Sequence, residues 1–400
     1  MRTERYDVLV IGAGPAGSRA AELTAAAGLS TLLIEKRPRI GSPVRCAEAV
    51  GPREVVERFV RLDENAISSP VHGFAIISPS GKRYEAHWPD IGLIVDRERF
   101  DTSIAAAASE AGARVLTSHQ ALSLLGSGGS VEGAVVADLE SGERFEARAA
   151  VTVGADGVES LSPRWAGLKG SHPPAEVMSC AQELVEGIDM SKRLLEFHIG
   201  SRRAPGGYAW VFPKGGNRAN VGLGVNPAMT AGGVRAADLL ESFLEERCPG
   251  ARRSRPVCGG TLVARGLRRL ATDGYLAVGE AANQNNPFSG GGIVNALEGA
   301  TIAAETIVEA LGRGENGAGA LGGYTRRWRK GTGRDNGIFW HAARSFYRLP
   351  DSDMERLIDR MKRTPGVVEN GGIRPMKLLR AVSGAGPGTF VRFLVARLGG

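Results

Sequence analysis

The sequence is poor in cysteine and has no long apolar run, and each shortage excludes a class of protein. Its cysteines, Cys46, Cys180, Cys248 and Cys258, show neither CxxC pairing nor His-rich spacing, which argues against a zinc site and a disulfide framework. No uninterrupted apolar stretch approaches the ~20 residues that cross a bilayer. The N-terminal residues lack the basic region and apolar segment of a signal peptide. We therefore expect free thiols, no bound metal, and a cytoplasmic or peripheral protein.

Charge is unevenly distributed along the chain. The formal net charge is +7, and Arg326 to Arg397 contains 16 Lys and Arg against 6 Asp and Glu, so this segment carries +10 and the remainder −3. An anionic membrane surface or a phosphorylated substrate would attract such a segment, although a solvated surface explains it equally well. The stretch Met376 to Leu398 alternates between basic and apolar residues, which predicts peripheral contact with an anionic membrane. The segment has no recognisable nucleic-acid-reading motif, so we expect no nucleic-acid partner.

Glycine is abundant, at 56 of 400 residues, and many glycines follow predicted strands. Apolar patterning predicts a strand over Tyr6 to Ile11, a helix over Pro15 to Gly28 and a strand over Ser30 to Glu35, which together form a βαβ unit. Farther along we expect antiparallel strands over 74–94, a helix over 97–111, a strand over 114–117, a hairpin over 131–149, strands over 177–225, a helix over 236–246, a strand over 274–278 and a helix over 293–311. The segment 312–323 has the composition of a Gly/Ala linker.

The first βαβ unit carries Gly12-Ala13-Gly14-Pro15-Ala16-Gly17 between its strand and its helix. In this pattern the first glycine permits a tight turn, the second lets the backbone approach a pyrophosphate, and the third allows close helix packing. Phosphates are favoured there by the free N–H groups and the dipole of the helix. Glu35, followed by Lys36, ends the second strand, where a carboxylate can accept hydrogen bonds from a ribose. A second GxGxxG match over 317–322 follows a polar loop, and we discard it. This unit alone does not separate NAD from FAD.

Two later motifs indicate FAD. Val153-Gly154-Ala155-Asp156-Gly157 follows one expected strand, and Val278-Gly279-Glu280-Ala281-Ala282 follows another, before Pro287 and the run Gly290-Gly291-Gly292-Ile293 open a helix. The set resembles the fingerprints of the FAD-binding superfamily that includes the aromatic hydroxylases. A helix N-terminus near Gly292 would stabilise negative charge on reduced flavin. That family usually has Asp where this chain has Glu280, so the extra methylene requires a small shift. The alternative is that these glycines are only turn residues in ordinary loops and bind no cofactor.

Two further segments resemble the geranylgeranyl reductases. Gly41-Ser42-Pro43-Val44-Arg45-Cys46-Ala47-Glu48 is similar to the segment after the second strand in archaeal-type members, and Pro205-Gly206-Gly207-Tyr208-Ala209-Trp210-Val211-Phe212-Pro213 matches their PxxYxWxFP motif. Arg97 matches an arginine that lies near the cofactor in that family, although a salt-bridged surface turn is the alternative. The resemblance covers most of residues 1–310. It implies cofactor binding by Gly12, Gly14, Pro15, Ala16, Gly17, Glu35, Lys36, Arg45, Cys46, Ala47, Arg97, Asp156, Gly157, Glu280, Pro287, Gly290, Gly291, Gly292 and Ile293.

The aromatic motif predicts an apolar wall. Alternation along a strand places Tyr208, Trp210 and Phe212 on one face, in a chain that is only 6% aromatic. Such a wall suits a polyprenyl chain, which must be held by burial at roughly 25 cal/mol per Å². The alternation alone is explained equally well if the three rings are ordinary hydrophobic core residues. With the resemblance, Tyr208, Trp210, Phe212 and Pro213 are the predicted substrate-binding residues.

The motifs lie at the start, middle and far end of the chain, so we expect one nucleotide-binding domain built from discontinuous pieces. The predicted fold class is α/β: a Rossmann-like FAD-binding domain with an inserted antiparallel β-sheet substrate domain and a helical C-terminal region. The FAD-binding domain would comprise residues 1–70, 95–170 and 270–320. Residues 71–94 and 171–269 would form the β-rich substrate domain, and 321–400 the basic C-terminal region.

The resemblance implies an FAD-dependent oxidoreductase that saturates double bonds of geranylgeranyl chains in isoprenoid lipid precursors, with hydride from reduced flavin. An isolated alkene also needs a proton, and Cys46, with Tyr208 and Trp210, is the predicted catalytic set; a plain buried cysteine is the alternative for Cys46. The electron donor can be NADPH, ferredoxin or a deazaflavin. A flavin monooxygenase or halogenase acting on an aromatic or quinone substrate is the rival enzyme. A flavoprotein that only passes electrons or carries lipid is the non-enzymatic alternative.

Overall fold

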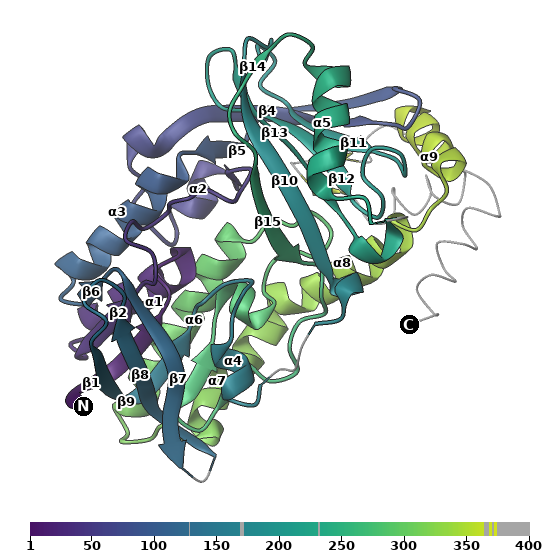
Figure 1. The fold of residues 1–400 in the computed structure, drawn as a ribbon. Coiled ribbons are helices and arrows are strands. Elements are labelled where there is room, and N and C mark those ends of the chain that lie inside the picture. The colour runs from purple at the N-terminus through teal and green to yellow at the C-terminus, as the bar shows by residue number, and fades with distance from the viewer. Residues whose placement is uncertain (128, 169–171, 231–232, 364–367, 370–371, 374–400) are drawn as a thin grey trace.

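The computed structural model describes residues 1–127, 129–168, 172–230, 233–363, 368–369 and 372–373. The described chain contains two large sheets with helices packed against and between them. Figure 1 shows β1, β2 and β9 at one end of the molecule, β10 to β13 at the other, and α6 between them. This arrangement confirms the predicted α/β fold with a nucleotide-binding unit, a second sheet and a helical C-terminal region.

The first sheet has the strand order β16-β17-β9-β1-β2-β6. Its strands are β1 (Arg2–Ile11), β2 (Thr31–Ile34), β6 (Arg114–Leu116), β9 (Arg144–Gly154), β16 (Ala271–Thr272) and β17 (Tyr275–Ala277). β1 pairs in parallel with both β2 and β9, and β17 pairs in parallel with β9. The last residues of β1 are fully buried because both faces of the sheet are covered.

Helices cover one face of this sheet, and a β-meander covers the other. α1 (Pro15–Ala26) packs against α3 (Arg97–Glu110) and α6 (Ile293–Leu311). Alanines on the facing sides of α1 and α6, among them Ala20 and Ala303, bring these two helices close together in one core. β7 (His119–Ser127) and β8 (Ser130–Asp138) extend antiparallel from β9. The hairpin of β8 and β9 was predicted, whereas β7 was not.

The second sheet has the strand order β14-β10-β13-β12-β11-β4-β5-β3, and β15 also pairs with β10. Its strands are β3 (Ala49–Val50), β4 (Ile67–Ile77), β5 (Arg83–Val95), β10 (Val177–Glu186), β11 (Leu195–Ile199), β12 (Tyr208–Pro213), β13 (Arg218–Val225), β14 (Arg252–Arg253) and β15 (Val257–Leu262). The prediction of an antiparallel sheet needs one correction, because β4 and β11 run parallel. α5 (Ala236–Arg247) packs on one face of this sheet and leaves the other face to the cavity described below.

The second sheet also begins earlier in the chain than we predicted. β3 pairs with β5, and β4 starts at Ile67, although both segments were assigned to the nucleotide-binding domain. The segment 41–48, which resembles the reductases, therefore connects β2 of the first sheet to β3 of the second sheet. This crossing brings the residues around Cys46 between the two sheets.

The C-terminal helices are α7 (Ala318–Lys330), α8 (Thr332–Phe346) and α9 (Asp351–Arg363). The predicted Gly/Ala linker over 312–323 is wrong in its second half, because α7 begins at Ala318 and buries Leu321 and Tyr324 in the core of the first sheet. Within the described residues, no helix is both long enough and apolar enough to span a bilayer. The membrane contact predicted for Met376 to Leu398 lies outside the described residues.

The remaining elements are short. They are α2 (Arg53–Val56), α4 (Ser162–Trp165), β18 (Val368–Glu369), β19 (Gly372–Ile373) and the 3-10 turns η1 (Glu64–Ala66), η2 (Pro174–Glu176), η3 (Pro227–Met229) and η4 (Gly279–Ala282).

Candidate active site

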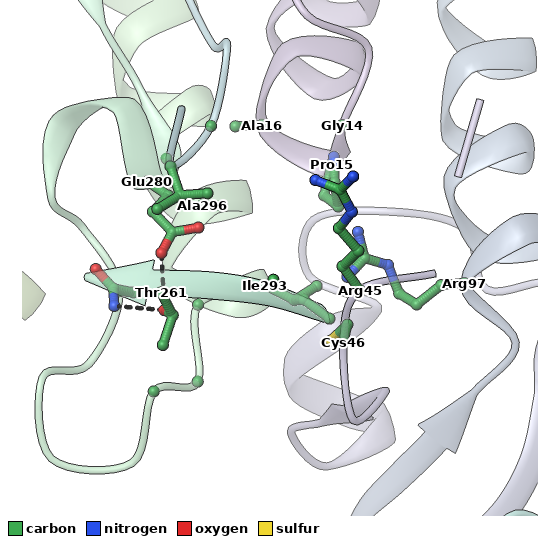
Figure 2. Close-up of a pocket in the computed structure, with 18 of the residues that line it drawn as sticks. Gly14, Pro15, Ala16, Arg45, Cys46, Arg97, Thr261, Glu280, Ile293 and Ala296 are labelled. Atoms are coloured by element: carbon green, nitrogen blue, oxygen red, sulfur yellow. Dashed lines mark hydrogen bonds between the residues drawn. The ribbon is translucent and has the colours of Figure 1, made fainter. Parts of the chain in front are cut away.

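A cavity of about 820 Å³ lies between the carboxyl ends of the first sheet's parallel strands and the open face of the second sheet. All but Gly17 and Pro287 of the predicted cofactor-binding residues line it, as do Tyr208, Trp210 and Phe212. Figure 2 shows Glu280 on one side of this cavity, Arg45, Cys46 and Arg97 on the other, and Ile293 between them. The structure thus brings the glycine motifs and the aromatic motif to a single site.

The loop between β1 and α1 approaches the cavity with its backbone. Gly12 has φ +103°, and a Cβ there would lie 2.5 Å from the carbonyl oxygen of Ala155. A Cβ on Gly17 would lie 1.8 Å from the carbonyl oxygen of Gly12, so Gly17 supports the loop from behind. A Cβ on Gly14 would meet no protein atom within 4 Å, and Gly14 lines the cavity. Because α1 has no side-chain cap at its N-terminus, its first N–H groups remain available to an anion.

Carboxylates hold the surrounding loops in place. The two oxygens of Glu35 accept hydrogen bonds from the backbone N–H groups of Ala13 and Arg37, each at 3.0 Å. Glu159, which sequence reasoning missed, accepts from Lys36 at 2.9 Å and from Arg45 at 3.0 Å. Through Glu159 the predicted cofactor residues Lys36 and Arg45 are tied together at one rim of the cavity. No sequence pattern marked Glu159, because the contact joins segments far apart in the chain.

Asp156 has a structural role in addition to the cofactor contact predicted for it. Its carboxylate accepts hydrogen bonds from the N–H groups of Leu161 and Ser162 at 2.9 Å each and from the Ser162 hydroxyl at 2.7 Å. These contacts hold the short helix α4, in the manner of a helix cap. Asp156 also lines the cavity, so the same residue both holds α4 and remains available to a bound cofactor.

Glu280 joins the two halves of the site. One of its oxygens accepts a hydrogen bond from the Thr261 hydroxyl at 2.7 Å (Figure 2). The same oxygen accepts the Leu262 N–H at 2.9 Å, and both donors lie in β15. The extra methylene of Glu, relative to the Asp usual in the superfamily, therefore lets this carboxylate reach the second sheet. Gly290, Gly291 and Gly292 follow and lead into α6, whereas the nearby Pro287 does not line the cavity.

The loop carrying Cys46 is clamped by side chains of the second sheet. The Gln182 amide donates to the carbonyl oxygen of Cys46 at 2.8 Å, and the Asn220 amide donates to that of Ala47 at 3.2 Å. Asn220 also donates to the Glu48 carboxylate at 2.7 Å. The thiol sulfur of Cys46 accepts the Glu48 N–H at 3.2 Å. The second sheet therefore fixes where this thiol faces the cavity.

Glu48 is a buried carboxylate that sequence reasoning quoted but gave no role. Its side chain is 3% exposed and forms an ion pair with Lys214, which is 13% exposed. One oxygen accepts the Arg97 N–H at 3.0 Å, at the start of α3. Glu48 adopts a left-handed backbone at φ +67°, which a residue with a side chain rarely adopts. Glu48 thus connects α3, β13 and the loop after β12 at the edge of the cavity.

Arg97 is not a surface ion pair. Its guanidinium donates two hydrogen bonds to Asp101, each at 2.7 Å, and both side chains are largely buried. Burial by itself lowers the pKa of Arg97, but the negative charge of Asp101 and its hydrogen bonds outweigh burial and raise it. Arg97 therefore stays charged beside the Cys46 thiol.

The aromatic residues form the floor of the cavity because their strand alternates. Tyr208 and Trp210 have ring centroids 5.9 Å apart, and Trp210 and Phe212 have centroids 6.4 Å apart. The intervening Ala209 and Val211 face α5 on the other side of the sheet. This confirms the predicted shared face for the three rings. Pro213, also predicted to bind substrate, ends β12 and does not line the cavity.

Glycines in β13 make room for these rings. Gly222 is paired with Trp210 on one side and with Gln182 on the other, and a Cβ on Gly222 would lie 2.4 Å from the Trp210 ring. Gly224 lies in the same way between Tyr208 and Cys180. The Gly-x-Gly alternation of β13 is the sequence signal that marks this floor.

Polar atoms in the floor are few. The Tyr208 hydroxyl donates to the carbonyl oxygen of Ser289, and burial, together with Cys180 and Cys46, raises the pKa of Tyr208 above its ordinary value. Burial and the charge of Glu280 raise the pKa of the Cys180 thiol to about 12. Within the described residues, Trp210 Nε1 and Gln182 Oε1 are buried without hydrogen-bond partners. These two atoms can contact a bound molecule or a water.

Taken together, the lining suits a flavin dinucleotide. The uncapped start of α1, the open space at Gly14 and the carboxylate of Glu35 provide for the pyrophosphate and the ribose. The glycines before α6 place a helix N-terminus at the far end of the same cavity.

Comparison with known proteins agrees with this arrangement. The family model for the FAD dependent oxidoreductases matches residues 7–158, and the model for the geranylgeranyl reductase catalytic domain matches residues 176–263. The digeranylgeranylglycerophospholipid reductase of Methanosarcina acetivorans is 40% identical over 363 residues, which cover 89% of this chain and 88% of that protein.

Solved structures show the same fold. A geranylgeranyl bacteriochlorophyll reductase-like protein from Thermoplasma acidophilum aligns with a TM-score of 0.89 and 32% identity, over 98% of this chain and 100% of that one. The flavin-dependent brominase Bmp2 aligns with a TM-score of 0.71 and 17% identity, over 99% of this chain and 98% of that one. The brominase is similar in fold alone.

Proposed function

The chain belongs to the digeranylgeranylglycerophospholipid reductase family of FAD-dependent oxidoreductases, and we propose that it saturates carbon–carbon double bonds of geranylgeranyl chains in isoprenoid lipid precursors. One observation carries this proposal: the floor of Tyr208, Trp210 and Phe212 lines the same cavity as the glycine loops of the nucleotide-binding unit. A hydrocarbon chain makes no hydrogen bonds, so burial against these rings is what can hold it.

FAD would be held mainly by backbone. The N–H groups at the start of α1 would bind the pyrophosphate, Glu35 would bind a ribose, and the glycines before α6 would hold the flavin end. When bound and reduced, the flavin supplies the hydride for the alkene. The protein must then hold the chain, exclude water and supply a proton to the other carbon.

Cys46 is the proposed proton donor. Cys46 lines the cavity, the Glu48 N–H donates to its sulfur, and the Arg97 guanidinium lies beside it. The Tyr208 hydroxyl already donates to Ser289, and its raised pKa makes it a poorer acid. Tyr208 and Trp210 therefore act by holding the chain.

The experiment mixes dithionite-reduced protein, under anaerobic conditions, with a geranylgeranyl lipid or with its fully saturated counterpart. We expect the flavin to reoxidise only with the unsaturated lipid and the product to gain two mass units per reduced bond. Cys46→Ser should slow reoxidation by about 10²–10⁴-fold, as for the loss of a general acid, whereas Cys258→Ser, at an exposed cysteine, should not. Reoxidation that requires oxygen and adds an oxygen atom would instead indicate a monooxygenase, and an unaffected Cys46→Ser would exclude this thiol as the acid.

The electron donor and the membrane contact are part of the same proposal. NADPH, ferredoxin or a deazaflavin would deliver electrons at the cavity that holds the flavin. The basic segment from Arg326 to Arg397 would attract anionic lipid, where the substrate is found. We expect sedimentation with phosphatidylglycerol vesicles that is lost when residues 376–400 are removed. Equal sedimentation of the truncated chain would contradict this contact.

A further inference from the structure

Two neighbouring apolar side chains on α8 are exposed, and the function proposed so far does not use them. Ile338 is 64% exposed and Phe339 is 37% exposed. Among the described residues only Met1 exceeds Ile338 as an exposed large apolar side chain, and no other such residues are consecutive. Single exposed apolar residues are ordinary, but an adjacent pair on one helix indicates a contact surface.

The packing of α8 holds this pair outward. The Asn336 amide donates to the carbonyl oxygens of Gln284 at 2.9 Å and Asn285 at 3.2 Å. Ala343 follows Asn336 by seven residues, lies on the same side of the helix, and is also buried. Ile338 follows Asn336 by only two residues, which places it about 200° around the helix axis. The contacts that anchor α8 therefore turn Ile338 away from the protein.

A tryptophan and two arginines border the exposed pair. The Cζ atom of Arg344 lies 4.8 Å from the centre of the Trp340 ring, and that of Arg265 lies 5.8 Å from it, so both guanidinium groups contact this ring. Within the described part of the chain, neither arginine forms an ion pair. The α8 patch is the set of Ile338, Phe339, Trp340, Arg344 and Arg265.

An anionic lipid surface complements this patch. Large apolar side chains suit the outer acyl region of a bilayer, tryptophan is favoured at the level of the head groups, and cations without acidic partners are attracted to lipid phosphates. The only acidic residue of α8, Asp335, is paired with Arg334 at 3.2 Å, so it does not offset these cations. The patch therefore presents apolar and positively charged groups together.

Charge disfavours the other occupants that this chain could provide. The segment 374–400 contains five Lys and Arg and no Asp or Glu, so it is repelled by Arg265 and Arg344. A symmetric dimer through α8 would place the patch against its own copy, with like charges opposed. An occupant of opposite charge is therefore favoured.

The helix α8 connects the patch to the candidate active site. Phe346 follows Phe339 by seven residues, and its ring centroid lies 5.4 Å from that of Phe288. Phe288 and Tyr347, which follows the last residue of α8, line the cavity. About two turns of one helix separate the patch from the cavity wall. Contact with a membrane through α8 therefore brings the cavity close to the lipid.

We propose that the α8 patch docks on an anionic bilayer, with Ile338 and Phe339 among the outer acyl chains and with Arg265 and Arg344 on lipid phosphates. The inference rests on the proposed function, in which the substrate is a lipid precursor. It assigns insertion to a folded helix, while the basic segment 376–398 adds attraction at longer range. Both are needed, because a small apolar patch or a cluster of charges alone binds weakly.

The test uses the full-length protein with bound FAD and vesicles of phosphatidylglycerol or phosphatidylcholine, separated by sedimentation. Ile338→Ser with Phe339→Ser removes the apolar part of the patch, and Arg344→Gln removes one of its charges. Leu139→Ser, at a 50% exposed residue after β8, and Arg252→Gln, at an 84% exposed side chain in β14, are the matched controls.

We expect the wild type to bind phosphatidylglycerol vesicles more tightly than phosphatidylcholine vesicles. The double variant should bind the anionic vesicles at least roughly tenfold more weakly, because two large apolar side chains no longer leave water. Arg344→Gln should weaken binding less and reduce its dependence on salt. The proposal is overturned if the double variant binds as the wild type does, if Leu139→Ser weakens binding equally, or if the double variant changes only its oligomeric state.

A second measurement locates the contact. Bromine on the acyl chains of phosphatidylglycerol quenches tryptophan fluorescence only at short range. The quenching should be largely lost in Trp340→Phe, and quenching that this change leaves intact would also overturn the proposal.

Reduction of a geranylgeranyl lipid in detergent separates this inference from the proposed function, because the double variant should retain that activity. Patch-dependent docking without reduction would refute only the proposed function. Reduction in detergent without patch-dependent docking would refute only this docking surface.

Discussion

The nucleotide side of the cavity and the floor opposite it are built in different ways. On the nucleotide side, Gly12, Gly14 and Gly17 lie within six consecutive residues, and the backbone forms the contact surface. On the floor, Trp210 and Gln182 come from different strands and meet across Gly222. One surface is thus local in sequence and made of main chain, and the other is non-local and made of side chains.

This difference decides how each surface tolerates change. Main-chain contacts are lost when any side chain is added, because the backbone has no rotamers with which to move aside. Side-chain contacts can repack, so changes in the floor should alter affinity and specificity before they alter folding. The following predictions test this contrast.

Gly17→Ala should have the largest effect. Its Cβ would lie 1.8 Å from a backbone oxygen, which cannot move without displacing the whole loop. We expect a loss of roughly 3 kcal/mol or more in the free energy of unfolding, measured by urea denaturation. Gly14→Ala is the matched change, because a Cβ there meets no protein atom within 4 Å. That variant should fold normally but bind FAD at least roughly tenfold more weakly. Equal free energies of unfolding for the two variants would refute the difference between a glycine packed against backbone and one that faces the cavity.

Glu48→Ala should come next. It removes the partner of a largely buried Lys214, and leaving a buried charge unpaired costs about 3–5 kcal/mol. We expect a lower urea midpoint and a changed environment of the flavin, seen as a shifted absorbance spectrum. Glu64→Ala breaks an exposed ion pair with Arg53 and is the control, which should leave both unchanged. A stable Glu48→Ala protein with a normal spectrum would show that the loop is held by the amides of Gln182 and Asn220 alone.

Gly222→Ala should act on the floor without affecting the nucleotide side. A Cβ at Gly222 would lie 2.4 Å from the Trp210 ring, which must then move, whereas at Gly224 the nearest atom is the Cys180 sulfur at 3.2 Å. We expect Gly222→Ala to weaken binding of the prenyl chain by roughly tenfold, with FAD content unchanged, and Gly224→Ala to have a smaller effect. Loss of FAD from the Gly222→Ala protein would refute the expectation that the floor and the nucleotide side respond independently to substitution.

The smallest effect concerns Cys180, which we predict to be unreactive. Its pKa is raised to about 12, so at pH 8 only about one thiol in 10⁴ is the reactive thiolate. Iodoacetamide at pH 8, followed by mass spectrometry, should label the exposed Cys258 and leave Cys180 unmodified. The thiolate fraction of Cys180 rises tenfold per pH unit below 12, so labelling should become appreciable only as the pH approaches that value. Equal labelling of Cys180 and Cys258 at pH 8 would contradict a thiol kept neutral by burial.

Sequence alone determined whatever depends on local backbone geometry. The glycines of the first loop, the helices α1 and α6, and the alternation of Tyr208, Trp210 and Phe212 follow from periods and spacings within one segment. The resemblance of Arg45, Cys46 and Arg97 to a family motif identified another part of the lining.

Tertiary structure alone decided the contacts between distant segments. It hydrogen-bonds Asp156 to the start of α4 and Glu280 to β15, and it pairs Glu159 with both Lys36 and Arg45. It also placed Gln182 and Glu48 around Cys46 and left Ile338 and Phe339 exposed on α8. The physical reason is that a hydrogen bond or a cavity depends on which surfaces the fold brings together, and that information lies in no single stretch of the chain.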